Sequence, residues 1–460
     1  MHFPSILTLG LATTFASLST AHTVLTTIWV DGKNQGDGTC IRMGLNPDRT
    51  TFPIPSIDSS DMACGLDGHT PVAFTCPAKA GSSLTFAFRS WADDPSRGPI
   101  DKSHVGSISI YLKHLSSPSA SATGGGWFKI FHSGYSESKQ KWSAATLIDN
   151  HGLLTVSIPS AIPSGPYLVR TEVLALQNYP ETQFFVNCAQ LYITGTPGSS
   201  IPDSKTVSIP GHVHYSDKGL NYNIYETDPS KTPYLIPGPK PYFPTSSSSS
   251  LSTSSSQTSG LIPKGCILKN ANWCATELPN FNSENSCWTA SDDCWRQVEE
   301  CYAVAPPSGY HGCKLWSERK CDIVQKGCKD GAWEGPKNKG EKIATEGEVS
   351  QPVPGGKLPR VDKGEDRDTD DGEGKAVVVG PGVPVASETV TSSTTFKVVT
   401  TTATETKTSS ATLTTTSSKG QLGGGVAGAT SVKPVPVPTT GAVGGGCKGG
   451  RQRRRVVVVN

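Results

Sequence analysis

The sequence predicts an all-β fold, a β-sandwich, for residues 22–243. Short apolar runs alternate there with segments rich in Gly, Pro, Asn and Asp, and a long helical period is absent. Asp31-Gly32 supplies a turn directly after the first apolar run. Roughly 220 residues are also a normal size for one all-β domain. We expect strands at 24–30, 84–88, 108–112, 153–158, 167–176 and 183–193.

Composition changes sharply along the 460 residues and divides the chain into segments. The N-terminal apolar run is too short to span a bilayer, and the small residues Ser19, Thr20 and Ala21 that a signal peptidase requires follow it. In order, we expect a signal peptide at 1–21, the β-sandwich at 22–243, a Ser/Thr-rich linker at 244–261, a cysteine-rich module at 262–334 and a disordered low-complexity tail at 335–460.

Charge and hydropathy exclude several classes of partner. A formal net charge of +2 gives no electrostatic reason to bind nucleic acid. No second apolar segment of membrane length follows the signal peptide, so we expect no membrane partner. Thirteen cysteines suit an oxidising compartment. We therefore expect a secreted, extracellular protein, and a monomer.

The cysteines form two even groups and one remainder. Four lie in the β-sandwich region and eight between Cys266 and Cys328, so each group can pair completely. Cys447 is left as a free thiol, an intermolecular partner or part of a segment that the working protein does not retain. Eight cysteines allow many connectivities, and the four bridges of the module stay unassigned.

The module also carries a helical signal and many aromatic residues. Cys287, Cys294 and Cys301 recur every seven residues, which predicts one face of a helix with Ser291 as its N-cap. The aromatic rings either form a sugar-stacking surface or fill a small core, and the sequence leaves both possibilities open. They belong to Trp273, Trp288, Trp295, Tyr302, Tyr310 and Trp316.

Removal of the signal peptide would make His22 the first residue of the mature chain. Its α-amine and its imidazole would then offer two nitrogens to one metal ion, whereas cleavage a residue or two away would replace the amine by an amide. A second imidazole would complete a planar set of three nitrogens, which copper favours. His104, which lies before the strand expected at 108–112, is the candidate, although a lone histidine there is more often a surface or capping residue.

Signatures of common hydrolases are missing. There is no Gly-x-Ser-x-Gly elbow, no His-Glu-x-x-His motif and no phosphate-binding glycine loop. The adjacent carboxylates Asp93-Asp94 and Asp292-Asp293 are more often solvated turn or helix-start residues than a glycosidase pair. The nitrogen set around His22 is therefore the strongest candidate for chemistry.

Motifs spread through the β-sandwich region resemble those of the fungal lytic polysaccharide monooxygenases of auxiliary activity family nine. The resemblance covers about half of the chain and does not extend to the module or the tail. The motifs are His22-Thr23-Val24, Val30-Asp31-Gly32, residues 36–42, 61–64, Ser103-His104-Val105-Gly106, residues 126–130, 167–170, 183–188, Asn223-Ile224-Tyr225 and residues 236–239.

The resemblance implies an immunoglobulin- or fibronectin-like β-sandwich that binds one copper ion on a flat face. His22 would ligate through its amine and one ring nitrogen, and His104 through one ring nitrogen. The implied reaction is oxidative cleavage of cellulose or a related β-1,4-glucan at C1 or C4. Its co-substrate is O₂ or H₂O₂, and a small reductant or a redox partner protein supplies electrons. The resemblance also implies the disulfide Cys64–Cys188, which leaves Cys40 to pair with Cys76.

Three residues depart from the family pattern around the implied copper. Phe185 occupies the axial position, where the family has a tyrosine, so no axial oxygen is available. Gln177 stands where a second-shell histidine is expected, and Thr171 replaces a histidine that commonly follows the arginine. Gln183, which faces the oxygen species in the family, is kept. We take Gln183 and Gln177 as the catalytic candidates, although an amide cannot shuttle a proton as an imidazole can.

The substrate face is marked less clearly. His212 and Tyr215 follow Pro210-Gly211, near the place where the family often has a tyrosine, and would stack on or hydrogen-bond a sugar. Surface turn residues are the alternative.

Two other functions compete with the monooxygenase. The departures at Phe185, Gln177 and Thr171 favour a catalytically weakened protein that binds copper and polysaccharide. A plain glycoside hydrolase would act without reductant or metal. Release of oxidised oligosaccharides with ascorbate separates the monooxygenase from the binding protein, and release of reducing sugars without reductant and in EDTA indicates the hydrolase.

Overall fold

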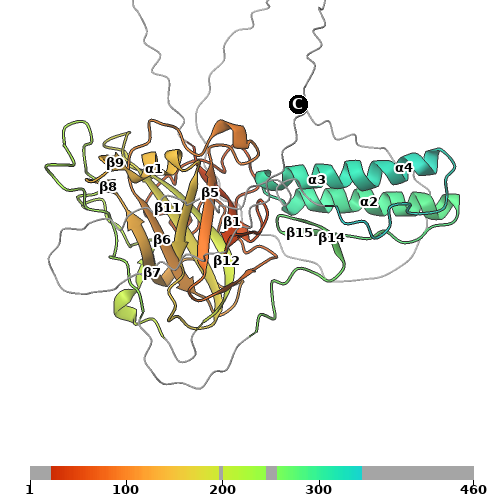
Figure 1. Cartoon of the computed structure of the whole chain (residues 1–460), viewed down its shortest axis with the longest axis horizontal. Coiled ribbons are helices and arrows are strands. Elements are labelled where there is room, and N and C mark those ends of the chain that lie inside the picture. The colour runs from red at the N-terminus through yellow and green to blue at the C-terminus, as the bar shows by residue number, and fades with distance from the viewer. Residues whose placement is uncertain (1–21, 196–199, 245–255, 344–460) are drawn as a thin grey trace, which may run out of the picture. The chain divides into compact units, whose positions relative to one another are not determined.

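The computed structural model describes residues 22–195, 200–244 and 256–343. The expected signal peptide, most of the expected linker, most of the expected tail and Cys447 lie outside the described residues. Up to residue 244, the described chain forms two main β-sheets (Figure 1). One of them has the strand order β10-β5-β1-β2 and consists of β1 (Val24–Val30), β2 (Lys33–Asn34), β5 (Ser83–Arg89) and β10 (Leu153–Ser157).

The second sheet has the order β13-β7-β6-β11-β12-β3, and β4 pairs with β12 in parallel. Its strands are β3 (Ile41–Arg42), β4 (Cys76–Lys79), β6 (Ile108–His114), β7 (Gly124–Ser133), β11 (Gly165–Ala175), β12 (Gln183–Thr194) and β13 (Val207–Ile209). Smaller elements complete this region: β8 (Tyr135–Ser136), β9 (Lys141–Trp142), helix α1 (Ser143–Asp149) and short 3₁₀ turns at Ser60–Met62, Pro95–Arg97 and Asp203–Lys205.

The second sheet is buried on both faces, which explains the long apolar runs of β11 and β12. Val169 and Val173 of β11 join the core between the sheets, whereas Leu168 and Leu174 point to a second core under the covering loops. Side chains alternate across a strand, so a strand covered on both sides needs apolar residues at nearly every position. The pairing of β11 with β12 extends from Gly165↔Ile193 to Ala175↔Gln183.

The all-β sandwich is confirmed, and each strand expected from the sequence is present. The ends differ by one or two residues, as at β11 and β6. Strand β7 was not expected, because its glycine-rich start, Gly124 to Gly126, hides the alternation that follows. Two disulfides lie at the second sheet, and this is the expected pairing: Cys64–Cys188 links a loop to β12, and Cys40–Cys76 links the residue before β3 to β4.

Gly106 holds the segment before β6 against β11. The amide of Leu176 donates to the carbonyl of Val105, and the amide of Leu174 donates to that of Ser107. A Cβ at Gly106 would lie 1.9 Å from the carbonyl oxygen of Leu174, far inside contact distance. We therefore expect Gly106→Ala to lower the free energy of unfolding by about 2 kcal/mol, measured by urea denaturation.

The matched control is Gly125→Ala on β7, because a Cβ there meets nothing within 4 Å. Its effect should stay within about 0.5 kcal/mol. Equal stability of the two variants would contradict the close approach at Gly106.

The cysteine-rich region consists of a hairpin and a helical cluster. The elements are β14 (Cys266–Asn270), β15 (Trp273–Thr276), α2 (Glu284–Val304), a 3₁₀ turn at Pro307–Gly309, α3 (Tyr310–Trp316), a π-helical turn at Ser317–Cys321 and α4 (Asp322–Lys329) (Figure 1). Its disulfides are Cys266–Cys274, Cys287–Cys328, Cys294–Cys321 and Cys301–Cys313. In the described part of the chain, no helix has the length and hydropathy of a membrane span.

The expected cysteine-bearing helix is α2, but the N-cap prediction was wrong. The helix begins at Glu284, and Ser283 caps it through a reciprocal pair of hydrogen bonds with Ser286. Ser291 lies in the middle of α2 and is buried. Ser291 precedes two aspartates, as an N-cap often does, but packing extends the helix two turns further toward its N-terminus.

The aromatic residues of this region divide between core and surface. Trp316 is fully buried and its ring centroid lies 6.2 Å from that of Trp273. Trp288 and Trp295 pack against the same core. Tyr302 keeps 43% of its surface exposed. Core filling therefore accounts for the tryptophans but not for Tyr302.

Candidate metal centre

His104 lies just before β6 in a turn that fixes its ring. Its backbone amide donates to the carbonyl of Asp101, and its Nδ1 lies 3.1 Å from the same oxygen. A carbonyl oxygen only accepts, so Nδ1 carries the hydrogen and Nε2 keeps its lone pair. This Nε2 is buried and has no hydrogen-bond partner.

Burial lowers the pKa of His104, and it outweighs the carboxylate and carbonyl of Asp101, which raise it. The charge of His22 lowers the pKa of His104 further. His104 is therefore neutral near pH 7, with a lone pair available to a metal.

His22 is brought to His104 by the start of β1. The amide of the next residue, Thr23, donates to the carbonyl of Thr51, and its Oγ1 donates to the carbonyl of Pro99. The imidazole of His22 is half-buried, with its centroid 4.7 Å from the ring of Phe52. Two histidines far apart in sequence thus interact at one end of the β-sandwich.

Phe185 of β12 lies beside His104, with ring centroids 5.7 Å apart. The phenyl ring is buried and offers no ligand atom. Gln183 is two residues earlier on β12 and so on the same face. The Nε2 of Gln177 donates to the Oε1 of Gln183 at 3.1 Å, and the Tyr225 hydroxyl donates to the carbonyl of Gln177. The site therefore gathers His22, His104, Phe185, Gln183 and Gln177.

Thr171 lies two residues further along β11 from the site than Val173 does. It pairs with Asn187 across β11 and β12, whereas Val173 pairs with Phe185. The Thr171 side chain is buried, and its Oγ1 has no hydrogen-bond partner.

The donor set fits copper. Both side chains are imidazoles, one Nε2 is already unpartnered, and a free amine at His22 would be a third nitrogen. In residues 22–195, 200–244 and 256–343, no group of three or more His, Cys, Asp or Glu side chains could share an ion. A site built from these two histidines therefore needs the terminal amine to reach three nitrogens.

The model of Auxiliary Activity family 9 (formerly GH61) matches residues 22–234. An AA9 family lytic polysaccharide monooxygenase C of Aspergillus tamarii is 45% identical over 344 residues, which cover 72% of this chain and 91% of that protein. The chain belongs to Auxiliary Activity family 9. An AA9 family lytic polysaccharide monooxygenase H of Botryotinia fuckeliana (strain B05.10) is 42% identical over 348 residues, covering 72% of this chain and 78% of that protein.

The solved structure "CvAA9A" is 32% identical, with a TM-score of 0.44, and covers 48% of this chain and 98% of that chain. Family 9 members are fungal copper-dependent monooxygenases that are secreted and act on polysaccharide with an external reductant. The match with the A. tamarii protein spans more residues than the β-sandwich, so the likeness extends beyond it.

His212 is not on the surface of this family 9 protein, which corrects the expectation that it contacts substrate. Its side chain is fully buried, with Nε2 2.9 Å from the Oε2 of Glu172. Arg170 Nη1 lies 2.7 Å from the same oxygen. A buried carboxylate requires donors, and the imidazole serves as one. Tyr215, in contrast, is 63% exposed, and its hydroxyl lies 3.2 Å from the Oγ of Ser56.

Sequence reasoning missed two aromatic residues beside His22. Phe52 and Trp91 remain exposed at 44% and 40%. The Trp91 ring is nearly parallel to the imidazole of His22, and the Arg97 guanidinium lies 4.6 Å from its centroid. Both are single aromatic residues in loops, and no spacing in the sequence marks them as neighbours of His22.

Proposed function

We propose that this chain is a secreted copper-dependent monooxygenase that cleaves β-1,4-glucan chains, including cellulose, at C1, C4 or both. Membership of family 9 supports the reaction class. The observation that carries the proposal for this chain is the His104 Nε2, which is buried without a hydrogen-bond partner, on an imidazole close enough to His22 for the two rings to interact electrostatically. A buried polar atom without a partner is costly, and a bound metal would remove that cost.

His22 would hold one copper ion through its α-amine and a ring nitrogen, and His104 would hold it through Nε2. Bound copper would supply the redox chemistry that activates O₂ or H₂O₂ with electrons from a small reductant or a partner protein. The hydrogen bond from His104 Nδ1 to Asp101 fixes the orientation of the second imidazole.

The neighbouring residues have distinct roles in this proposal. Phe185 would place a buried carbon ring beside His104 and the bound ion, and it offers the ion no ligand atom. The bond from Gln177 occupies the Oε1 of Gln183, so the Nε2 of Gln183 is the end that can donate to an oxygen co-substrate. Neither amide titrates, so any proton that the oxygen co-substrate takes up would come from solvent or from the substrate.

The polysaccharide would lie across the exposed rings next to His22. Phe52 and Trp91 contact His22 directly, and Tyr215 and Tyr225 are 63% and 71% exposed. Such rings offer an apolar face to the C–H face of a sugar, and tyrosine and tryptophan add a polar group that can form a hydrogen bond.

A second candidate function is a copper- and polysaccharide-binding protein with little turnover. The contact between Gln177 and Gln183 supports it, because the group beside Gln183 is an amide, which cannot carry a proton as an imidazole can.

The test is oxidation of cellulose by the copper-loaded secreted protein with ascorbate and O₂, after mass spectrometry has shown that the chain begins at His22. We expect oxidised oligosaccharides. The matched control has one extra residue before His22, which turns the amine into an amide and should abolish their release. Copper binding without products, while a known monooxygenase works, would favour the binding protein. Reducing sugars that appear without ascorbate and persist in EDTA would indicate a hydrolase.

A further inference from the structure

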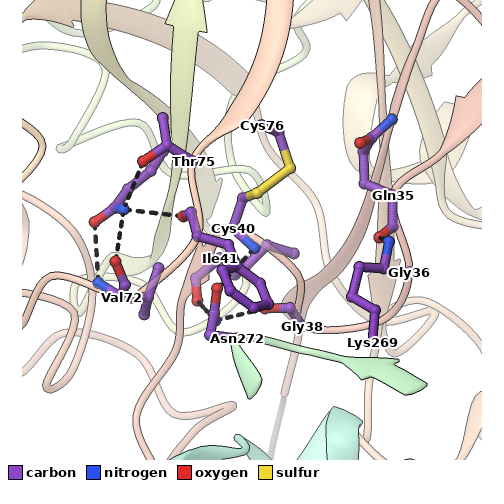
Figure 2. The surroundings of a disulfide bond; sticks show 12 residues. Gln35, Gly36, Gly38, Cys40, Ile41, Val72, Thr75, Cys76, Lys269 and Asn272 are labelled. Carbon is purple, nitrogen blue, oxygen red and sulfur yellow. Dashed lines mark hydrogen bonds between the residues drawn. A yellow bond between two sulfur atoms is a disulfide. The ribbon is translucent and has the colours of Figure 1, made fainter. Parts of the chain in front are cut away.

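Asn272 of the cysteine-rich module forms buried hydrogen bonds with the β-sandwich (Figure 2). Its Oδ1 accepts from the amide of Cys40 at 3.0 Å, and its Nδ2 donates to the carbonyl of Gly38 at 2.9 Å. Lys269 Nζ donates to the carbonyl of Gln35 at 2.6 Å. Both regions belong to the same compact unit of the chain. The hairpin of the module thus docks beside the Cys40–Cys76 disulfide.

The contact continues along the next segment of the β-sandwich. A Cβ at Gly38 would lie 2.9 Å from Pro306 of the module, so Gly38 allows a close approach. Ser308 reaches the sulfur of Met43, and the Tyr310 hydroxyl donates to the carbonyl of Leu45 at 3.4 Å. The module therefore reaches the loop that runs from Leu45 toward the metal centre.

That loop connects Tyr310 with His22. Seven residues after Leu45 it includes Phe52, whose ring lies 4.7 Å from the imidazole of His22. Leu45 is 47% exposed. On the module, the ring of Tyr310 packs edge-on against Tyr302, with centroids 5.7 Å apart.

Asp93 of the β-sandwich also lies near Tyr310. Burial raises the pKa of Tyr310, and the nearby carboxylate of Asp93 raises it further. Asp93 is two residues from Trp91, which stacks on His22. Between the metal centre and the module, Trp91, Phe52, Leu45 and Tyr302 are exposed and Tyr310 is half-buried; we name this set of five residues the aromatic belt.

We propose that Tyr302 and Tyr310 bind the polysaccharide surface on which the metal centre acts, so that the module extends the substrate face. This inference rests on the proposed function. Trp273, Trp288, Trp295 and Trp316 form or pack against the core of the module. Tyr302, in contrast, is 43% exposed and lies at the end of the belt. A tyrosine offers an apolar ring and a hydroxyl, which suit the C–H faces and hydroxyls of a neutral glucan.

The experiment measures binding of the full chain to microcrystalline cellulose by depletion, without reductant, for the parent, Tyr302→Ala and Tyr302→Trp. We expect the dissociation constant to rise about fivefold for Tyr302→Ala and to recover for Tyr302→Trp. The matched control is Trp333→Ala, because Trp333 is 40% exposed and lies beyond α4, outside the belt. Its dissociation constant should stay within about twofold of the parent's. Thermal unfolding of each variant separates lost binding from lost fold.

Two outcomes would overturn the inference: equal binding by the parent and a folded Tyr302→Ala, or an equal loss in Trp333→Ala. Because this measurement needs no turnover, its failure is distinct from failure of the proposed function. A protein that binds through Tyr302 but releases no oxidised sugar would support the extended face and contradict the monooxygenase.

Discussion

Replacing His104 with alanine is expected to weaken copper binding by more than about 100-fold, because even a residue that only orients a ligand contributes 10- to 100-fold. The substitution removes the unpartnered Nε2 and leaves His22 as a two-nitrogen ligand. Competition titration against a chelator of known affinity measures the loss. The electron paramagnetic resonance spectrum of Cu(II) should change as well, since one of the three proposed nitrogen ligands is lost.

His69→Ala is the matched control, because His69 is an exposed histidine on the same domain. Its copper affinity should stay within about twofold of the parent's. If His104→Ala bound copper as tightly as this control and gave the parent spectrum, His104 would not be a ligand.

Local pattern was sufficient to predict the β-sandwich. Apolar residues recur at every second position of a strand, and turn residues follow it, so both signals lie within a few positions. For this reason β1, β5 and β10 were expected within one or two residues of their observed ends. Because both faces of β11 are covered, apolar residues do not alternate with polar ones along it but form a nearly continuous run. Such a run is still typical of a strand. The glycines at the start of β7 removed the signal there.

The candidate site was predictable only in part. His22 is marked by its place behind the expected signal peptide, and His104 by the resemblance of the motif around it. The burial of His212 depends on Glu172, and no pattern in the sequence links the two. Phe52 and Trp91 meet His22 through the folding of separate loops. Contacts of this kind arise from packing, and a single sequence does not display them.

Glu172→Ala is expected to lower the free energy of unfolding by about 4 kcal/mol, because it removes the acceptor from a buried ion cluster. Arg170 lies on the same strand with its side chain fully buried, and His212 comes from the loop above. Without the carboxylate, the Arg170 charge would stay buried without its ion-pair partner. Urea denaturation at pH 7 measures the change. Glu137→Ala, at an exposed turn, is the control and should cost less than about 0.5 kcal/mol.

The same cluster predicts how stability depends on pH. Burial alone would raise the pKa of Glu172, but Arg170, His212 and Lys129 outweigh it and hold that pKa well below its usual range. Burial lowers the pKa of His212 despite its bond to Glu172. The unfolded chain therefore takes up protons at both groups at a higher pH than the folded chain.

The cluster should consequently contribute its full stabilisation near pH 7. This contribution should fall below about pH 6.5, where His212 of the unfolded chain takes up a proton, and further below about pH 4.5, where Glu172 does. The phenols of Tyr111 and Tyr234, which feel the charge of Glu172, have pKa values raised by burial and stay neutral throughout this range. Glu172→Gln removes the charge that raises the pKa of His212, so protonation of His212 becomes more costly in the folded variant, which should lose more stability than the parent between pH 7 and pH 5. Parallel pH profiles for the two proteins would show that Glu172 does not take part in the acid response.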